Sequence, residues 1–581
     1  MKKSVFVLIV TISHFIASLS LAAPSAGHAG MVVSAHPMAT QAGVEILRGG
    51  GNAADAAAAV AFVLAVVEPY SSGIGGGGFA LLKNNNDIRF LDFREVAPKQ
   101  ATRDMYIRDG KADTKLSRDG ILSVAVPGAV AGYLELQEQY GKLSRQDVLK
   151  RAIEYALDGF AVTTRYQNYA KKRLTQLRKD PEISRIFLVK DKNGEYQAPA
   201  IGHVVKQPEL AQTLSLISKD GASAFYKGSL ADALAADMKA RGGIVSKQDL
   251  ETFKIRYREP LVGSYRGHAL VSSPPPSSGG QIILSLLNVM EQRSVSKSYR
   301  SVDSLHLYIE ASKRVFADRA LLGDPHYLSY LPGLIPHLIA KDRGPLLLEA
   351  IEPTATPATS IAPAQGSALP IDVPRTQGAS HSAGMDTTHL SVVDKDGNAV
   401  GMTTTVNYSW GSCIVAKGTG MIWNDEMDDF AAAPGVPNAY GIVGSHANAV
   451  EPGKVPLSSM SPTFVFQKDS LTSPLQMVIG SPGGSRIPTT VAQAIMHVVD
   501  HGANAQEAIS IGRIHHQHLP DLVFVEDFAL EEATLKALEA KGHTLKLGGR
   551  WSNATIITID PKTNIRYGAA DPRGVGTALA E

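Results

Sequence analysis

The C-terminal third of the chain begins with Asp386-Thr387-Thr388-His389-Leu390-Ser391-Val392-Val393-Asp394. From Thr388 onward, the residue pattern alternates as it does in a β-strand. Residues 395–398 carry the Asp-Gly signal of a hairpin turn, and residues 399–407 return as a second strand. We therefore expect a β-hairpin here, with Thr387 as its first residue.

A change in composition precedes this hairpin. Residues 351–384 are rich in Pro, Ala, Thr, Ser and Gly and hold few large apolar side chains. Such a segment buries too little surface to order itself well. It is typical of an interdomain linker, and equally of a mobile tail beside a processing site, because exposed segments of small residues are where chains are cut.

The overall composition is that of a globular protein. The chain has 581 residues, of which 44% are hydrophobic and 19% charged, and its formal net charge is +2. Binding to nucleic acid or to an anionic membrane surface requires a concentrated basic field, and the sequence contains no basic stripe. We expect no nucleic-acid partner.

The N-terminus has the pattern of a secretory signal peptide. Lys2 and Lys3 precede an apolar run over residues 5–21, which leads to small residues around Ala22. An uncleaved membrane anchor is the alternative, but His14 interrupts the run and no basic stop-transfer cluster follows. We expect residues 1–22 to be removed, leaving an exported protein, periplasmic or secreted, without a stable membrane anchor.

The cysteine and histidine content predicts neither a disulfide nor a metal site. Cys413 is the single cysteine, so no internal disulfide can form. Its neighbours are typical of a buried strand, which favours a small buried hydrophobe over a nucleophile. Residues 515–518, His-His-Gln-His, lack the spacing and companion ligands of a known metal site. We interpret these histidines as structural and expect no metal and no cofactor.

A glycine-rich block follows the predicted N-terminal helices. Residues 41–48 are amphipathic, and Asn52 can cap an alanine-rich helix over residues 53–67. The block over residues 73–78 matches the spacing of a dinucleotide-binding fingerprint. That motif must follow a strand and open a helix, whereas here a helix precedes it and a strand over residues 79–82 follows. Close backbone packing or a turn is the better interpretation.

Further motifs accompany the residues around Thr387. In chain order they are the glycine block at 73–78, Leu91-Asp92-Phe93-Arg94-Glu95-Val96-Ala97-Pro98, Asn424-Asp425-Glu426-Met427-Asp428-Asp429-Phe430, Pro456-Leu457-Ser458-Ser459-Met460-Ser461-Pro462 and Gly480-Ser481-Pro482-Gly483-Gly484-Ser485-Arg486. Together with the junction at Thr387, they resemble the γ-glutamyltransferase (γ-glutamyltranspeptidase) family over nearly the whole mature chain. Each motif alone is a weak signal, and their joint order carries the resemblance.

The resemblance implies an α/β (α+β) protein with a four-layer αββα sandwich of the N-terminal-nucleophile hydrolase type. It places autocleavage between Asp386 and Thr387. Residues 23–386 would form the large subunit, with 351–386 as a mobile tail, and residues 387–581 the small catalytic subunit. Both subunits of one precursor would form the fold.

The chemistry of such a junction suits threonine. A threonine hydroxyl is a poor nucleophile without a nearby base. Cleavage would free the α-amine of Thr387, whose unperturbed pKa of about 7.7–8.0 lets it act as that base near neutral pH. By resemblance, Thr405 bonds the nucleophile, and the N–H groups of Gly483 and Gly484 form the oxyanion hole.

The resemblance also implies a site for both charges of a γ-linked glutamate. Its carboxylate site would comprise Arg94, Ser458 and Ser459, and its ammonium site Asp429, Glu426 and Asn407. Residues 430–455 resemble the family's lid, with Tyr440 over the pocket and within reach of Asn407. Some family members have Gln in place of Glu426, a difference that bears on pH response and substrate range.

We expect a γ-glutamyltransferase with glutathione hydrolase activity. Thr387 would take the γ-glutamyl group from glutathione or a related γ-glutamyl compound, and water, an amino acid or a peptide would accept it. One alternative is a glutaryl or β-lactam acylase of the same fold, whose substrates lack an α-amino acid head. Another is a non-catalytic binding homologue. The presence of Thr387, Thr405 and both glycines argues against it.

Overall fold

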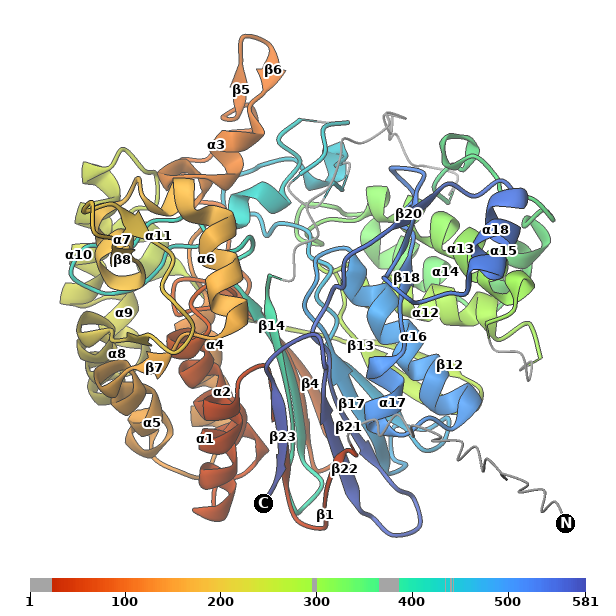
Figure 1. The fold of residues 1–581 in the computed structure, drawn as a ribbon, viewed down its shortest axis with the longest axis horizontal. Coiled ribbons are helices and arrows are strands. Elements are labelled where there is room, and N and C mark those ends of the chain that lie inside the picture. The colour runs from red at the N-terminus through yellow and green to blue at the C-terminus, as the bar shows by residue number, and fades with distance from the viewer. Residues whose placement is uncertain (1–22, 295–299, 365–385, 434, 439–440, 443) are drawn as a thin grey trace, which may run out of the picture.

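The computed structural model describes residues 23–294, 300–364 and 386–581, apart from 434, 439, 440 and 443 (Figure 1). The expected signal peptide, residues 1–22, lies outside the described residues. Among the helices of the described chain, none combines the length and apolar character needed to cross a membrane.

Two seven-stranded antiparallel sheets form the centre of the molecule. The first, called here the β14 sheet, has the order β11 (Arg256–Arg258), β4 (Asp87–Asp92), β3 (Gly77–Asn84), β15 (Ala399–Thr405), β14 (Thr388–Val393), β2 (Met31–Ser34), β23 (Thr577–Ala580). The second, the β17 sheet, has the order β1 (Ser25–Gly27), β22 (Arg566–Ala570), β21 (Thr555–Ile559), β17 (Leu475–Gly480), β16 (Thr463–Phe466), β13 (His268–Ser272), β12 (Leu261–Tyr265).

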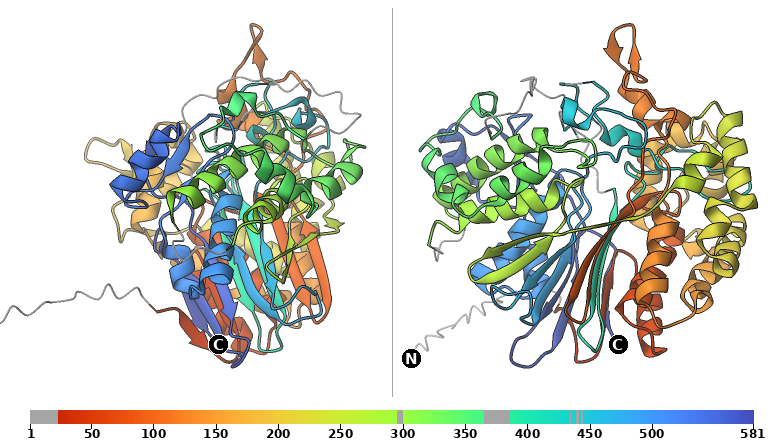
Figure 2. Two further views of the ribbon diagram at one scale, coloured as in Figure 1. Left: turned by 90° about the vertical axis from the view of Figure 1, so that its right-hand side faces the viewer. Right: turned by 180° about the vertical axis from the view of Figure 1, so that it is seen from behind.

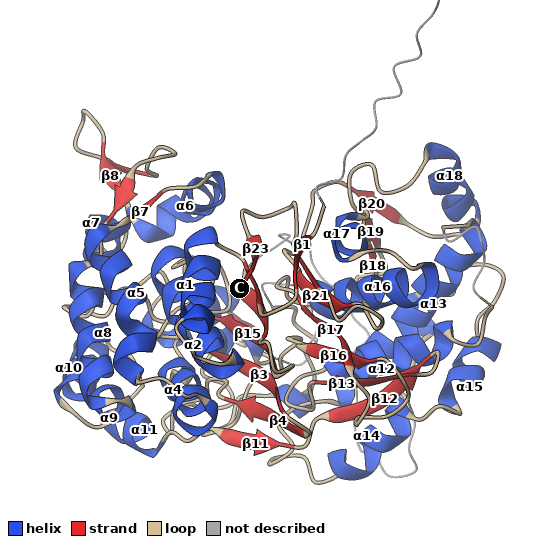
Figure 3. Ribbon diagram, turned by 90° about the horizontal axis from the view of Figure 1, so that it is seen from below, coloured by secondary structure: helices blue, strands red, loops and turns tan. Residues whose placement is uncertain are grey.

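Helices cover the outer face of each sheet, as Figures 2 and 3 show. The β14 sheet is covered by α1 (Pro37–Arg48), α2 (Ala53–Val67), α4 (Ala129–Tyr140) and α5 (Arg145–Asp158), and the β17 sheet by α12 (Gly279–Met290), α13 (Val302–Ala317) and α16 (Arg486–His501). Strand β3 shows the layering: Ala80 and Leu82 join the core under the helices, whereas Phe79 and Leu81 join the core shared with the β17 sheet. The predicted αββα sandwich is confirmed.

The remaining elements are shorter or peripheral. They are β5 (Ile107–Arg108), β6 (Lys111–Ala112), α3 (Thr114–Arg118), β7 (Phe160–Ala161), α6 (Thr164–Leu177), α7 (Pro181–Phe187), β8 (Val189–Lys190), β9 (Tyr196–Gln197), β10 (Val204–Val205), α8 (Pro208–Asp220), α9 (Ala222–Tyr226), α10 (Ser229–Ala240), α11 (Lys247–Thr252), α14 (Leu331–Ile339), α15 (Arg343–Glu349), α17 (Ala505–Ser510), β18 (Ile514–His515), β19 (Val523–Val525), α18 (Glu532–Ala540) and β20 (Leu545–Leu547). Short 3₁₀ turns connect some of them, including η2 (Asp318–Leu321) and η4 (Glu426–Asp429).

The predicted buried helix over residues 53–67 is α2. The Asn52 side chain accepts hydrogen bonds from N–H groups of the first turn, and the Asp55 carboxylate accepts one from the Asn52 N–H, which completes a capping box. Every residue of α2 is buried. A helix whose side chains are small and apolar on every face can pack between other elements, which explains the alanine content of α2.

The glycine block brings the start of β3 close to the end of β15, the second strand of the hairpin. A Cβ at Gly75 would clash with the carbonyl oxygen of Ile422, and one at Gly76 with that of Thr405. The pairing of β3 with β15 begins within this block, at Gly77 and Gly78. The interpretation of the block as a point of close backbone packing is confirmed.

Each sheet combines strands from both sides of the expected cleavage site. In the β14 sheet, β14 and β15 lie between β3 and β2 from the N-terminal part, and in the β17 sheet β16 pairs with β13. Separating the two parts would break backbone hydrogen bonds in both sheets. If the bond between Asp386 and Thr387 were cut, these strand pairs would still join the two parts.

The described part of the Pro- and Ala-rich segment, residues 351–364, is fastened to the fold. Thr356 O accepts a hydrogen bond from Lys313 Nζ at 2.8 Å, and Ala358 N–H donates one to Asp521 Oδ2 at 2.7 Å. The rest of the expected mobile tail, residues 365–385, lies outside the described residues.

Cys413 is buried but does not lie in a strand. It occupies a turn with φ of 59°, and its Sγ lies 3.0 Å from a guanidinium nitrogen of Arg173. The strand expectation was wrong because turn residues at Trp410 and Gly411, both with positive φ, interrupt the apolar run. Burial raises the pKa of the Cys413 thiol to about 12, which leaves it protonated and unsuited to attack.

Candidate active site

Thr387 stands directly before β14, where the sequence places it. Its side chain is buried, and its Oγ1 lies 2.9 Å from Oγ1 of Thr405 at the end of the neighbouring strand β15. The Asn407 N–H donates to the same Thr405 Oγ1 at 2.8 Å. That donor occupies one lone pair of Thr405 and leaves its hydroxyl free to interact with Thr387.

The backbone at Thr387 is in a region that β-branched residues avoid. Its φ is 85°. Non-glycine residues with positive φ are uncommon, and such conformations persist where the surroundings impose them, at a cost of about 1–3 kcal/mol. Here strand pairing begins at the next residue, where Thr388 is in register with Thr404. The strain therefore falls on the residue of the expected scissile bond.

Gly483 and Gly484 form the turn between β17 and α16. Their φ values are 129° and 57°, and a Cβ at Gly483 would lie 2.5 Å from Ser552 Oγ. Gly484 lines the same pocket as Thr387. The positive end of the α16 dipole lies directly beyond this turn. The turn is therefore suited to stabilise negative charge near Thr387.

Charged side chains meet beside Thr387 in a buried group. Arg94 Nη1 lies 2.6 Å from Glu426 Oε1, and Arg94 Nη2 lies 2.5 Å from Asp429 Oδ2. Arg94 Nε donates to the carbonyl of Pro456 at 2.8 Å. The predicted carboxylate residue and two of the predicted ammonium residues thus pair with each other in this structure.

Glu95, next to Arg94, interacts with Glu426 behind the pocket lining, a contact that the sequence did not predict. Burial, followed by the charge of Glu426, raises the pKa of Glu95 well above its usual value. Burial also raises the pKa of Glu426 to about 7, against the lowering effect of Arg94. The sequence signal that could have indicated Glu95 is its place in the motif at residues 91–98.

The pocket around these groups is nearly filled, with about 20 Å³ of free space. Its lining residues are Arg94, Arg319, Thr387, Thr405, Asn407, Glu426, Asp429, Ile442, Ser458, Ser459, Met460, Gly484 and Ile487. Of the predicted site residues, Gly483 and Asp386 adjoin this set without lining it, and Tyr440 lies outside the described residues. This space is smaller than a substrate group, so lining side chains would have to move to admit one.

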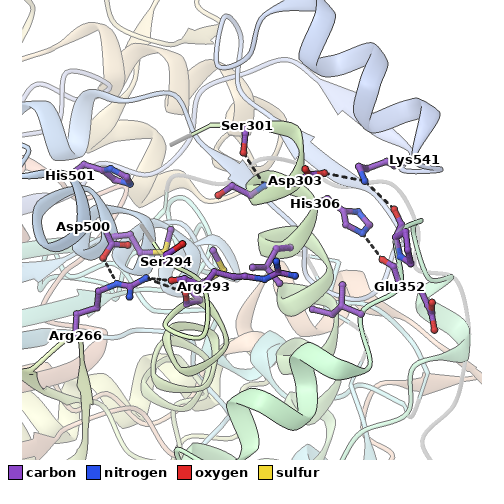
Figure 4. Close-up of a pocket in the computed structure, with 16 residues that line it drawn as sticks. Arg266, Arg293, Ser294, Ser301, Asp303, His306, Glu352, Asp500, His501 and Lys541 are labelled. Carbon is purple, nitrogen blue, oxygen red and sulfur yellow. Dashed lines mark hydrogen bonds and ion pairs between the residues drawn. The ribbon is translucent and has the colours of Figure 1, made fainter. Parts of the chain in front are cut away.

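A roomier cavity, of about 660 Å³, lies elsewhere against α13 (Figure 4). Two ion pairs lie along it: Arg266 pairs with Asp500 at 2.8 Å and Lys541 with Asp303 at 3.3 Å. None of the predicted site residues lines it.

The three histidines of residues 515–518 each have a separate hydrogen-bond partner. His515 bonds to Thr489 Oγ1, His516 to Asp521, and His518 to the carbonyl of Ala358. In the described chain, possible metal-ligand atoms lie within 4.8 Å of one another at His306, Glu310 and His543. Two cations already occupy the Glu310 carboxylate there, Lys313 at 2.9 Å and Arg314 at 2.7 Å. That group is therefore a poor metal site.

An αββα sandwich with a threonine at the start of a central strand, beside a glycine turn, defines the class of N-terminal-nucleophile hydrolases. Within that class, residues 39–581 match the family model described as gamma-glutamyltranspeptidase. The chain belongs to this family.

Individual relatives agree with this assignment. The glutathione hydrolase proenzyme of Escherichia coli (strain K12) is 41% identical over 558 residues, covering 95% of this chain and 91% of the relative. The acylase ACY 1 proenzyme of Pseudomonas sp. (strain V22) is 35% identical over 575 residues, covering 96% and 94%. Among solved structures, cephalosporin acylase from Bacillus halodurans has a TM-score of 0.82 at 27% identity, covering 99% of both chains.

Proposed function

We propose that this protein is a self-processing γ-glutamyltransferase with glutathione hydrolase activity. It cleaves the γ-glutamyl amide bond of glutathione and related compounds and passes the γ-glutamyl group to water, amino acids or peptides. Its family and its relatives named glutathione hydrolase proenzyme support an enzyme made from a precursor.

The observation that carries the proposal is the pairing of Arg94 with Glu426 and Asp429 within reach of Thr387. A pocket with both a cation and two carboxylates complements a substrate that carries both charges. The α-ammonium of a γ-glutamyl group would take the carboxylates, and its α-carboxylate would take guanidinium and serine donors. A glutaryl group has no ammonium and would leave the buried carboxylates without a substrate partner.

In the first step, Thr387 Oγ1 attacks the carbonyl carbon of Asp386. The C–N bond breaks, the acyl group moves to oxygen, and the Thr387 nitrogen takes up the proton. Water then hydrolyses the ester, which leaves a carboxylate on Asp386 and a free α-amine on Thr387. Positive φ at Thr387 favours this step, because cleavage of the preceding bond releases the strain.

In the second step, the neutral α-amine accepts the proton of Thr387 Oγ1 as this oxygen attacks the γ-carbonyl of the donor. Gly483 and Gly484 N–H groups stabilise the oxyanion, each worth about 3–4 kcal/mol of barrier. The amine returns the proton to the leaving nitrogen, and an acyl-enzyme forms. Water or an amino group then attacks the ester and regenerates Thr387. Thr405 orients the nucleophile throughout.

Comparison of two matched substrates tests the proposal. The purified, processed protein should hydrolyse γ-L-glutamyl-4-nitroanilide with a kcat/KM at least about 100-fold above that for glutaryl-4-nitroanilide, given the value of charged hydrogen bonds in a buried site. Equal or reversed preference would indicate the acylase alternative. Turnover of neither compound by processed protein would indicate the non-catalytic alternative.

We also propose that the processed enzyme is a heterodimer of residues 23–386 and 387–581, exported after removal of residues 1–22. The strands shared between both parts support the heterodimer. The basic, apolar and small-residue order of the N-terminus supports export. Mass spectrometry of protein from the periplasm or medium should give masses that start near Ala23 and at Thr387.

A further inference from the structure

A basic cavity, called here the α6 pocket, lies between α6 and two loops of the C-terminal part. Its volume is about 330 Å³, and its lining includes Arg165, Tyr169 and Lys172 of α6 together with Arg550 and Arg573. All charged residues of the lining are basic. Lys172 and Arg550 are exposed, and neither lies within 4.0 Å of a carboxylate of the described chain. The α6 pocket is therefore suited to an anion.

The α6 side of this pocket adjoins the two strands that hold the nucleophile. Arg165 Nε lies 4.0 Å from one carboxylate oxygen of Glu68, and the other oxygen of Glu68 accepts a hydrogen bond from Thr388 Oγ1 at 3.0 Å. Thr388 is the first residue of β14. Lys172 Nζ lies 4.8 Å from the ring centre of Tyr408, three residues beyond the end of β15. The pocket wall is thus joined to both β14 and β15.

The opposite side of the pocket adjoins the glycine turn. Arg550 stands two residues before Ser552, whose Oγ would lie 2.5 Å from a Cβ at Gly483. Gly574, also in the lining, packs so closely on Asn553 that a Cβ there would lie 2.2 Å from Asn553 Oδ1. Both sides of the α6 pocket therefore contact backbone next to the catalytic residues.

Asp386 lies in the field of this basic lining. Its side chain is fully buried. Burial raises the pKa of its carboxyl, and the charges of Lys172, Arg165 and Arg173 oppose that rise. Two of these three cations line the α6 pocket. Because Asp386 is bonded to the Thr387 nitrogen, the positive field lies on the side of that nitrogen.

The proposed reaction needs its leaving group on the same side. The α-amine of Thr387 gives a proton to the leaving nitrogen, so the two nitrogens must lie close together. An acceptor reverses this step: its nitrogen attacks the ester carbon, the bond from that carbon to Thr387 Oγ1 breaks, and the proton of the acceptor nitrogen passes through the α-amine to Oγ1. Leaving group and acceptor therefore approach Thr387 from the side on which Asp386 lies in the precursor.

We propose that the α6 pocket is the acceptor site, where Lys172 and Arg550 bind the carboxylate of an acceptor amino acid or peptide and Arg165 adds positive charge. This assignment rests on the proposed function and gives its second substrate a place. The same contacts would hold the carboxylate of a departing dipeptide. In the precursor the Asp386 carboxylate stands close to this position, and cleavage of its bond to Thr387 makes room for the acceptor.

Two matched acceptors isolate the contribution of the carboxylate. Glycylglycine carries it, and glycylglycinamide has a neutral amide in its place. With γ-L-glutamyl-4-nitroanilide as donor, the γ-glutamyl product of each acceptor is quantified by chromatography, and kcat/KM for the acceptor is determined. The processed wild-type enzyme is compared with the double variant Lys172→Gln, Arg550→Gln, which should fold because both side chains are exposed. Lys171→Gln is the matched control, since Lys171 is the exposed neighbour of Lys172 and does not line the pocket.

Wild type should use glycylglycine at least about 10-fold better than glycylglycinamide, and the double variant less than about 3-fold better. Lys171→Gln should keep the wild-type ratio. A wild-type ratio near 1, or a wild-type ratio retained by the double variant, would overturn the inference and leave the proposed function intact. A processed wild-type enzyme that releases no nitroaniline from the donor would overturn the proposed function, and this inference with it.

Discussion

The pH dependence of substrate capture should depend on Glu426. Burial raises the pKa of its carboxyl to about 7, the repulsion of Asp429 adds to this, and Arg94 opposes it. Glu426 must be ionised to accept the α-ammonium. With a pKa of about 7, its ionised fraction falls about 10-fold between pH 8 and pH 6. In the variant Glu426→Gln this titration is absent.

The assay is the pH profile of kcat/KM for γ-L-glutamyl-4-nitroanilide, which reports the ionisations of the free enzyme. Two groups should shape its acid limb, Glu426 and the α-amine of Thr387, so the logarithmic slope should approach 2. Glu426→Gln should have a lower kcat/KM at pH 8 and a slope near 1. The exposed Glu532→Gln serves as the control and should behave as wild type. An acid limb of unchanged slope in Glu426→Gln would refute this account of the ammonium site.

Three further outcomes are expected. Thr405→Val removes the hydrogen bond to Thr387 and leaves the Asn407 N–H without its acceptor. Self-processing, followed on gels, and turnover, measured as initial rates, should both slow about 10- to 100-fold. Rates within about 2-fold of wild type would contradict this role of Thr405. Gly483→Ala places a Cβ 2.5 Å from Ser552 Oγ, on a residue whose φ is 129°. The turn should therefore shift and kcat should fall at least about 100-fold. Activity near that of wild type would exclude Gly483 from the oxyanion hole. The cleaved parts should elute as one species in size-exclusion chromatography and separate only in denaturant, because both sheets interleave them; separation in native buffer would contradict the shared sheets.

Local features of the fold could be predicted from the sequence. The buried helix over residues 53–67, the hairpin after Thr387 and the close approach at residues 73–78 each depend on neighbours along the chain. Capping by Asn52, the Asp-Gly turn and the small glycines are signals of that kind. The layer order came from the family resemblance, and the structure confirms it.

The electrostatics of the site could not be predicted in this way. Arg94 and Glu426 are more than 300 residues apart, and their pairing depends on how β4 and η4 meet. The raised pKa of Glu95 results from burial and from the charge of Glu426, which no local pattern encodes. Arg319 lies in a short turn without a motif of its own. The apolar run around Cys413 predicts a strand, but positive φ values at Trp410, Gly411 and Cys413 produce a turn that the residue pattern does not reveal.

Thr387 is the residue on which the whole account depends, and one gel tests it. Purified Thr387→Ala should remain a single full-length chain after prolonged incubation, while wild type splits into two bands whose smaller member begins at Thr387 by N-terminal sequencing. Should Thr387→Ala split at the same bond, or wild type split at another, Thr387 is not the nucleophile.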